Sequence, residues 1–207
     1  MPRPRSLTRP GIATAALAVL DRDGLAALTM RVVAKELGMA TMSLYRYVAD
    51  RDELEVLVVD HVLADLDLSV PPDPWRTRIT VLLERMHAAV HAHREVVPLV
   101  VRHRHAAPAS LRWIEAMLAV LTEAGFTGRR RVVAQRTLVA FLLGALQNEY
   151  YGPLSGAGTA AMAELSISDF PVLAETAAQA RGVPPAEEFR AGLDIVLDGL
   201  SAAPSAR

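Results

Sequence analysis

Residues 29–47 of the chain read TMRVVAKELGMATMSLYRY, and this stretch decides the fold of the amino-terminal part. Thr29 is a suitable N-cap because its hydroxyl can accept a hydrogen bond from a free amide of the first helical turn. The small Ala34 leaves room for a second helix, and Gly38 can adopt the left-handed conformation that ends a helix in a sharp turn. Leu44 would then face back toward Ala34. The spacing predicts a helix-turn-helix.

The second helix of this motif, predicted over residues 41–48, presents hydroxyls, aromatic rings and one guanidinium group without any acidic side chain. Arginine can bond a guanine edge or clamp a phosphate, hydroxyls can bond bases or phosphates, and methionine can contact a thymine methyl. Such a surface suits the DNA major groove. The spacing leaves open an ordinary helical hairpin that binds no DNA. The side chains concerned are Thr41, Met42, Ser43, Tyr45, Arg46 and Tyr47.

The charge distribution points the same way. The whole chain carries a net charge of −1, but its first 51 residues hold eight basic and four acidic side chains. A basic head on an acidic body suggests that the head meets a polyanion. The flanking side chains placed to hold backbone phosphates are Thr29, Arg31, Arg51 and, in an amino-terminal arm, Arg3 and Arg5.

Helical periodicity runs through the chain, and no alternating strand pattern of useful length occurs, so we predict an all-α fold of about nine or ten helices. A three-helix DNA-binding head is expected over residues 1–52, followed by a connecting helix over 52–67. Prolines at 71–74 then interrupt the chain, and a larger helical body is expected over 68–207. The glycine-rich residues 152–159 predict a loop.

The composition excludes several classes of protein. The longest apolar run covers residues 138–146, which is short of the ~20 residues that span a membrane, so no membrane partner is expected. The absence of cysteine excludes disulfides and thiol nucleophiles and fits the cytoplasm. Without a nucleophile elbow or a phosphate loop after a strand, we expect neither an enzyme nor a cofactor. A non-DNA-binding helical interaction protein remains the alternative.

Residues 28–38, 43–48 and 51–54 resemble the DNA-binding head of TetR-family transcriptional regulators, and the rest resembles a tetracycline-repressor-like C-terminal domain. The resemblance implies a repressor that binds a pseudo-palindromic operator as a homodimer, with its heads in successive major grooves. The alternative of a transcriptional activator with the same fold stays open. The positions that the family uses for DNA contact fall on Thr29, Arg31, Thr41, Met42, Ser43, Tyr45, Arg46, Tyr47 and Arg51.

The resemblance also implies that the body binds a ligand and dimerises. In the family, the long eighth helix and the last helix of each subunit form a four-helix bundle. On the last helix of this chain one face carries Phe189, Leu193, Val196 and Leu200, which we expect at the dimer interface. The alternative is that this stripe packs inside its own subunit.

A small-molecule effector is implied as well, bound in the body so that its binding releases the operator. The Mg²⁺-holding positions of tetracycline repressors align with Val100 and Asn148, which would not hold the metal chelate. We therefore expect a mainly hydrophobic effector of unknown identity. The expected lining residues are Leu82, Met86, Val100, Met117 and Phe141, with polar points at His61, His103, Arg104, Gln147 and Asn148.

The spacing of one acidic residue and two histidines suggests a metal site. Glu84, His87 and His91 would lie on one face of a helix, and histidines at i and i+4 can share Zn²⁺. Because no fourth ligand is evident and the helix turns apolar residues inward, we expect no metal.

Overall fold

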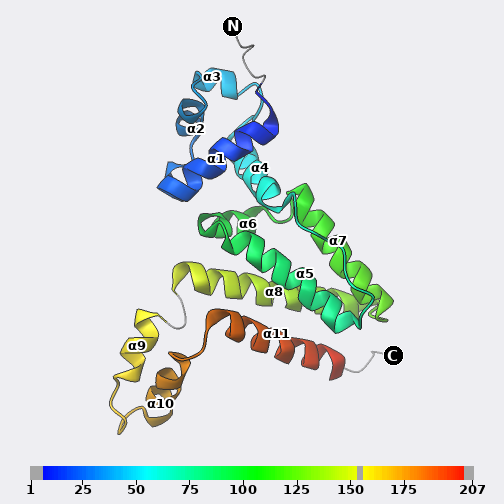
Figure 1. Ribbon diagram of the computed structural model, residues 1–207, viewed down its shortest axis with the longest axis vertical. Helices are drawn as coiled ribbons and strands as arrows, with labels where there is room; N and C mark the ends of the chain where they lie inside the picture. The colour runs from blue at the N-terminus through cyan, green and yellow to red at the C-terminus, as the bar shows by residue number, and fades with distance from the viewer. Residues whose placement is uncertain (1–6, 153–155, 203–207) are drawn as a thin grey trace. The chain divides into compact units, whose positions relative to one another are not determined.

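The computed structural model describes residues 7–152 and 156–202, and every regular element in these ranges is helical (Figure 1). The predicted all-α fold is confirmed, with eleven α-helices, two 3₁₀ helices and no strand among the described residues. None of these helices is both long and apolar enough to cross a membrane. The α-helices are α1 (Arg9–Asp23), α2 (Met30–Glu36), α3 (Thr41–Leu44), α4 (Arg51–Leu63), α5 (Trp75–His91), α6 (Val97–His103), α7 (Pro108–Glu123), α8 (Gly128–Tyr151), α9 (Ala157–Ala163), α10 (Pro171–Ala180) and α11 (Pro185–Ala202); the 3₁₀ helices are η1 (Leu25–Ala27) and η2 (Arg94–Val96).

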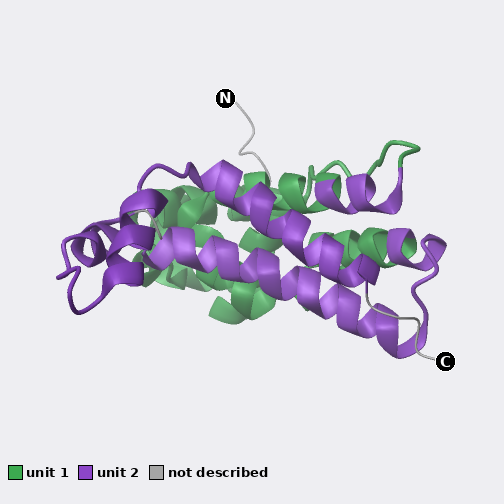
Figure 2. Cartoon of the chain, turned by 90° about the horizontal axis from the view of Figure 1, so that it is seen from below, with its two compact units in different colours: residues 1–73, 81–119 green, residues 74–80, 120–207 purple. Residues whose placement is uncertain are grey.

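The chain divides into two compact units (Figure 2). The first comprises residues 1–73 and 81–119, and the second comprises residues 74–80 and 120–207. The head therefore shares a unit with α6 and with the larger parts of α5 and α7. The predicted boundary near residue 68 separates a proposed DNA-binding part from a proposed ligand-binding part, and it stays a prediction.

The head packs α1, α2 and α3 together with α4 around apolar side chains. Thr8 caps α1, since its hydroxyl accepts a hydrogen bond from the Gly11 amide at 3.2 Å. The helix ends at Gly24, whose φ of 78° lies in the left-handed region. The largest fully buried side chains of the head are Ile12, Leu20, Leu28, Leu44, Leu54 and Leu63.

Asp50 is the N-cap of helix α4, and Glu53 in the first turn bonds back to the residue before the cap. The Glu53 amide donates to the Asp50 carboxylate at 2.8 Å, and the Ala49 amide donates to the Glu53 carboxylate at 2.6 Å. The helix ends at Leu63, before the predicted end at residue 67. Beyond this end, the carbonyl and the carboxylate of Asp67 both accept from Arg85 of α5, at 2.9 Å each.

The rest of the first unit is an apolar core between the larger parts of α5 and α7 and helix α6. Leu82, Met86, Val100 and Met117 are buried there. The Trp113 indole N–H donates to the Leu82 carbonyl at 2.9 Å, so this buried donor is paired. The core is therefore largely apolar, although the buried Ser110 hydroxyl on α7 has no hydrogen-bond partner among the described residues.

The second unit is built on α8 and α11, which lie in contact. The rings of Phe141 and Phe189 pack with centroids 5.3 Å apart. Elsewhere in the unit, the buried Phe126 ring meets the Trp75 ring edge-on at 5.1 Å, and the Arg130 guanidinium lies 4.2 Å above it. Such aromatic pairs add to the free energy gained from area burial alone.

Helices α9 and α10 pack against each other within the second unit. The glycine-rich stretch led us to expect a loop up to residue 159, whereas α9 already begins at Ala157. Its remaining residues are mostly alanine, which has the highest helix propensity and outweighs the single glycine inside the helix. Residues 153–155 of the predicted loop lie outside the described ranges.

A buried carboxylate joins α4 to α6 within the first unit. Glu55 is completely buried, and its Oε1 accepts from Arg51 Nε at 2.7 Å. Its Oε2 accepts from Arg102 at 2.9 Å and lies 2.8 Å from His103 Nε2. Burial raises the pKa of the Glu55 carboxyl, but the hydrogen bonds from His103 and Arg51 and the charge of Arg102 outweigh it and hold the pKa below its usual value.

We predict that Glu55→Gln lowers the free energy of unfolding at pH 7 by about 2 kcal/mol, because the variant removes the buried carboxylate that pairs with the partly exposed Arg51 and Arg102. The depressed pKa means that Glu55 stabilises the fold above the ordinary glutamate pKa of about 4.3 and loses this effect as the pH falls through the lower folded value. Urea unfolding between pH 7 and pH 3 should therefore show the difference between wild type and variant shrinking with acid. Glu115→Gln, an exposed position on α7, is the control. A difference that is constant with pH would contradict the prediction.

Candidate nucleic-acid interface

The predicted helix-turn-helix forms as expected at its first helix and turn. The Val32 amide donates to the Thr29 hydroxyl at 3.3 Å, which caps α2. Gly38 has a φ of 66°, and the Met39 amide returns to the Ala34 carbonyl at 2.9 Å. This is the bond pattern of a helix end closed by a left-handed glycine.

Helix α3 is shorter than the sequence predicted. It covers Thr41–Leu44 rather than residues 41–48, and a turn follows in which the Tyr47 amide donates to the Leu44 carbonyl at 2.9 Å. Arg9 donates to the Tyr47 carbonyl at 2.9 Å and pairs with Glu53 at 2.8 Å. The turn is thus tied to α1 and α4, which the local periodicity of the segment does not reveal.

Residues 41–48, called the recognition segment below, leave part of their polar and aromatic side chains exposed. Leu44 and Val48 are buried and anchor it, whereas Met42 is 76% exposed, Tyr45 is 44% exposed and Arg46 is exposed. Thr41, Ser43, Tyr47 and Thr29 are half-buried, and Arg31 is exposed. The side chains predicted to contact DNA are therefore accessible.

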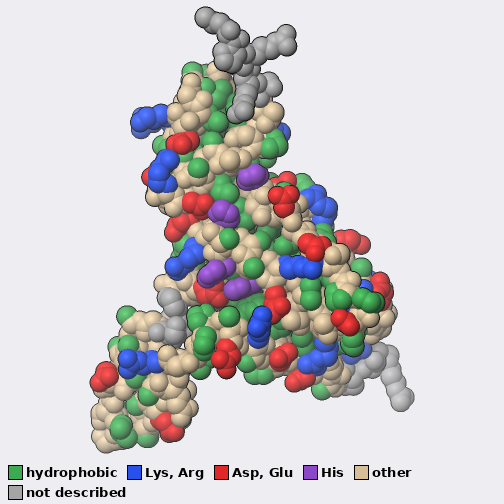
Figure 3. Space-filling model, in the orientation of Figure 1, with side chains coloured by type: hydrophobic (Ala, Val, Ile, Leu, Met, Phe, Trp, Pro, Cys, Tyr) green, Lys and Arg blue, Asp and Glu red, His purple; other side chains and the backbone are tan. Residues whose placement is uncertain are grey.

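The basic side chains of the head differ in their partners. Within residues 7–152 and 156–202, neither Arg31 nor Arg46 forms an ion pair with another side chain. Arg51 instead bonds Glu55 through Nε and the Leu25 carbonyl through Nη2, at 3.3 Å. On the face shown in Figure 3, basic side chains lie at the edge of the head beside α1 and α2. The predicted arm residues Arg3 and Arg5 lie outside the described ranges.

Two residues of the head escaped the sequence analysis. Arg9 fixes the backbone that follows α3, and Glu55 fixes Arg51. The four-residue spacing of Arg51 and Glu55 was the available signal, since an i, i+4 pair on a helix lies within reach. No comparable signal links Arg9 to Tyr47, which is 38 residues away.

Most residues expected around an effector lie in the first unit. Leu82, Met86, Val100 and Met117 are buried in its apolar core, as described above. His61 Nε2 lies 3.2 Å from the Thr14 hydroxyl, and Arg104 donates to the Val101 carbonyl. The buried His103 already bonds Glu55. Two of the expected polar points are thus engaged in bonds between helices, namely His61 and His103.

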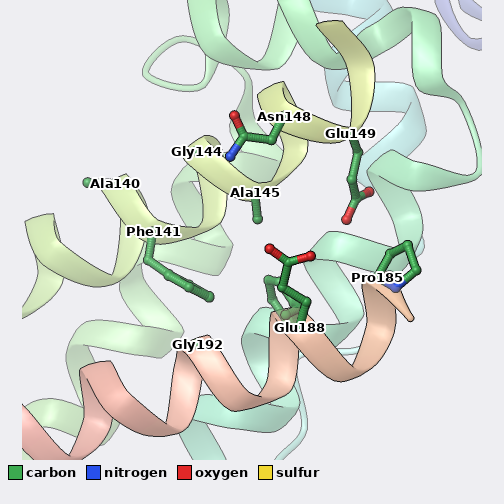
Figure 4. Close-up of a pocket in the computed structure, with 10 residues that line it drawn as sticks. Ala140, Phe141, Gly144, Ala145, Asn148, Glu149, Pro185, Glu188 and Gly192 are labelled. Carbon is green, nitrogen blue, oxygen red and sulfur yellow. The ribbon is translucent and has the colours of Figure 1, made fainter. Parts of the chain in front are cut away.

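The second unit holds a groove of about 370 Å³ between α8 and α11 (Figure 4). Phe141 and Asn148 of the expected pocket line it, whereas Gln147 does not. A Cβ added at Gly192 would stand 2.9 Å from Phe141 Cε2, so only glycine allows this approach of the two helices. The groove is lined by Ala140, Phe141, Gly144, Ala145, Asn148, Glu149, Pro185, Glu188, Phe189 and Gly192.

The apolar stripe of α11 packs largely inside its own subunit. Phe189, Leu193 and Leu200 are buried within the chain, and Val196 is half-buried. The dimer interface predicted on this stripe is not tested by a single chain, but three of its four side chains are already covered. Ile195, 73% exposed, lies on the other side of the helix.

In the described part of the chain, Glu84, His87 and His91 do not bring three potential ligand atoms together. His87 and His91 stack with their ring centroids 5.8 Å apart on α5. Among the described residues, the group that brings three potential ligand atoms within 4.8 Å of one another is Asp52, Glu55 and His103. The Glu55 oxygens in that group already accept from two guanidinium groups. On the face shown in Figure 3, histidines are spread over α4 and the carboxyl end of α5.

The chain is similar to known bacterial regulatory proteins along most of its length. Residues 12–55 match the family model of bacterial regulatory proteins of the tetR family, and residues 69–203 match that of the tetracyclin repressor-like C-terminal domain. The chain is 28% identical to the HTH-type transcriptional repressor DrrR1 of Streptomyces coeruleorubidus, over 96% of this chain and 78% of that protein. It is 30% identical to the class A tetracycline repressor protein of transposon 1721 from Escherichia coli, over 90% and 87% of the two chains.

A solved structure agrees along nearly the whole length. The Streptomyces coelicolor TetR family protein ActR, in complex with (S)-DNPA, superposes with a TM-score of 0.83 at 27% identity, over 95% of this chain and 98% of that chain. The match covers the helix-turn-helix and the helical body alike. The chain therefore belongs to the TetR family of bacterial transcriptional regulators.

Proposed function

We propose that this regulator represses transcription as a homodimer and is released from its operator by a small, mainly hydrophobic effector. The observation that carries the proposal is the exposed surface after Gly38, in a chain whose two halves match the TetR family. In this proposal residues 1–52 bind DNA, residues 52–67 connect, and residues 68–207 bind the effector and dimerise. A bacterial operator as partner also favours a cytoplasmic location.

The chemistry of the recognition segment supports direct contact with base edges. The Arg46 guanidinium can donate two hydrogen bonds to a guanine, and Met42 can contact a thymine methyl. Thr41, Ser43, Tyr45 and Tyr47 offer hydroxyls on the same segment. Thr29, Arg31 and Arg51 stand at helix starts beside it and suit backbone phosphates, which hold the head in register without reading sequence.

The open faces of α8 and α11 support dimerisation. Exposed or half-exposed positions follow helical spacing along both flanks of the groove, and several of them are small. Small side chains let helices of two subunits approach closely, as helix bundles require. This revises the predicted interface toward the neighbouring face. The proposed face consists of Val133, Thr137, Ala140 and Gly144 on α8 with Glu188, Gly192, Ile195 and Gly199 on α11.

The composition of the body supports an apolar effector. Val100 aligns with a metal-binding position of tetracycline repressors, and Val100, Leu82 and Met117 are all buried in an apolar core. A Mg²⁺ chelate needs oxygen ligands that these residues do not offer. The ActR relative was crystallised in complex with (S)-DNPA, which supports ligand binding in this fold.

The double variant Arg46→Ala with Tyr45→Ala should lower the affinity for an operator duplex selected from a random DNA pool by about 10²-fold, since it removes base contacts worth about 1–3 kcal/mol each. Fluorescence anisotropy would measure the change. Arg51→Ala should instead weaken binding to every sequence and reduce the slope of log affinity against log salt by about one. Arg112→Ala, exposed on α7, is the control. Unchanged affinity in the double variant would refute the assigned surface.

Ile195→Asp should convert the dimer into monomers, because a carboxylate between Gly192 and Gly199, where the two helices would approach closely, would be desolvated without a partner. Analytical ultracentrifugation at micromolar concentration would give the mass. Val172→Asp on α10 is a matched control, since Val172 is 74% exposed and lies outside the proposed face. Equal masses for the two variants would argue against this interface.

A panel of apolar, drug-sized compounds should contain members that weaken operator binding about tenfold or more, as a coupling free energy of 1–3 kcal/mol allows. Mg²⁺ with tetracycline should leave binding unchanged. Anisotropy of the same duplex would report both. Release by metal chelates alone would overturn the hydrophobic effector.

A further inference from the structure

We propose that Glu55 is a positioning residue that links the phosphate contact of Arg51 to the position of helix α6. The proposal rests on the proposed DNA-binding function of the head. It concerns a single buried carboxylate whose two oxygens face different partners, one on the DNA-binding side and one on the body side of α4.

Arg51 is held in place by two hydrogen bonds that leave other N–H donors of its guanidinium available. Its Nε donates to Glu55 Oε1 at 2.7 Å and its Nη2 donates to the Leu25 carbonyl at 3.3 Å. A guanidinium has five N–H donors, so three remain for a phosphate. The side chain is 45% exposed, which leaves those donors accessible. Glu55 thus fixes the direction in which Arg51 offers its charge.

The other oxygen of Glu55 contacts two side chains of α6. Arg102 donates to Oε2 at 2.9 Å, and His103 Nε2 lies 2.8 Å from the same atom. Asp52, one turn before Glu55, is a second acidic group beside this cluster. A fully buried carboxylate is costly to leave unpaired, so α6 and the start of α4 are bound to the same charge.

The arrangement couples the two sides electrostatically. With Arg102 in place, the negative charge of Glu55 is shared between two guanidinium groups. When Arg102 withdraws, the carboxylate acts more strongly on Arg51, and a DNA phosphate must compete harder for that guanidinium. Any displacement of α6 that breaks the Arg102 contact should therefore weaken operator binding through Arg51.

The test is a double-mutant cycle on operator affinity. Arg102→Met keeps the aliphatic stem of a side chain that is 58% exposed, so the fold should tolerate it. We expect Arg102→Met to lower affinity for the selected operator duplex about three- to tenfold in the wild-type background. In an Arg51→Ala background it should have less than about a 1.5-fold effect, whereas in an Arg31→Ala background the full effect should persist.

Two controls separate positioning from general damage. Arg102→Lys should restore most of the affinity, because it keeps a cation near Glu55, and Arg112→Met should have no effect although it removes the same charge from the unit. Urea unfolding of each variant identifies losses of folded protein. An equal effect of Arg102→Met in the wild-type and Arg51→Ala backgrounds, or no effect in the wild type, would overturn the proposal. Failure of the proposed DNA surface would appear separately, as unchanged affinity in the Tyr45 and Arg46 double variant.

Discussion

The packing of α3 against α2, with Leu44 buried, is the constraint on which the proposed DNA-binding surface depends. Gly38, with its left-handed φ, reverses the chain so that Leu44 is fully buried. Burial of one side of so short a helix leaves the other side in solvent, where Met42 lies, and Arg46 is exposed in the turn that follows. The proposed recognition chemistry therefore depends on apolar packing, because an isolated helix of four residues is not stable by itself.

The parts of the head that the sequence predicts correctly are those with local causes. The Thr29 cap and the Gly38 turn each depend on residues within a few positions, so their signals are visible in the chain. The turn that follows α3 depends on a distant residue, since Arg9, which lies 38 residues earlier, donates a hydrogen bond to the Tyr47 carbonyl. Glu55 makes both a local contact and distant contacts. Its spacing from Arg51 is readable, but its partners on α6 lie 47 and 48 residues further along.

The body shows a different limit of sequence analysis. Periodic apolar residues on α11 indicate that one face is buried, but periodicity does not say whether the covering helix belongs to the same chain or to a partner. In this chain α8 provides part of that cover, and Phe189 meets Phe141 directly. The glycine at 192 carries the complementary information, because its missing Cβ marks where two helices come closest.

The bond between Arg9 and the Tyr47 carbonyl separates the support of the recognition turn from its surface. The atoms that hold the turn are a main-chain oxygen and buried aliphatic groups, and none of them belongs to the outward side chains of Met42, Tyr45 or Arg46. A paralogue could exchange these three residues for others and keep the same backbone platform. Divergence toward new promoters would then need no compensating change in the interior of the head.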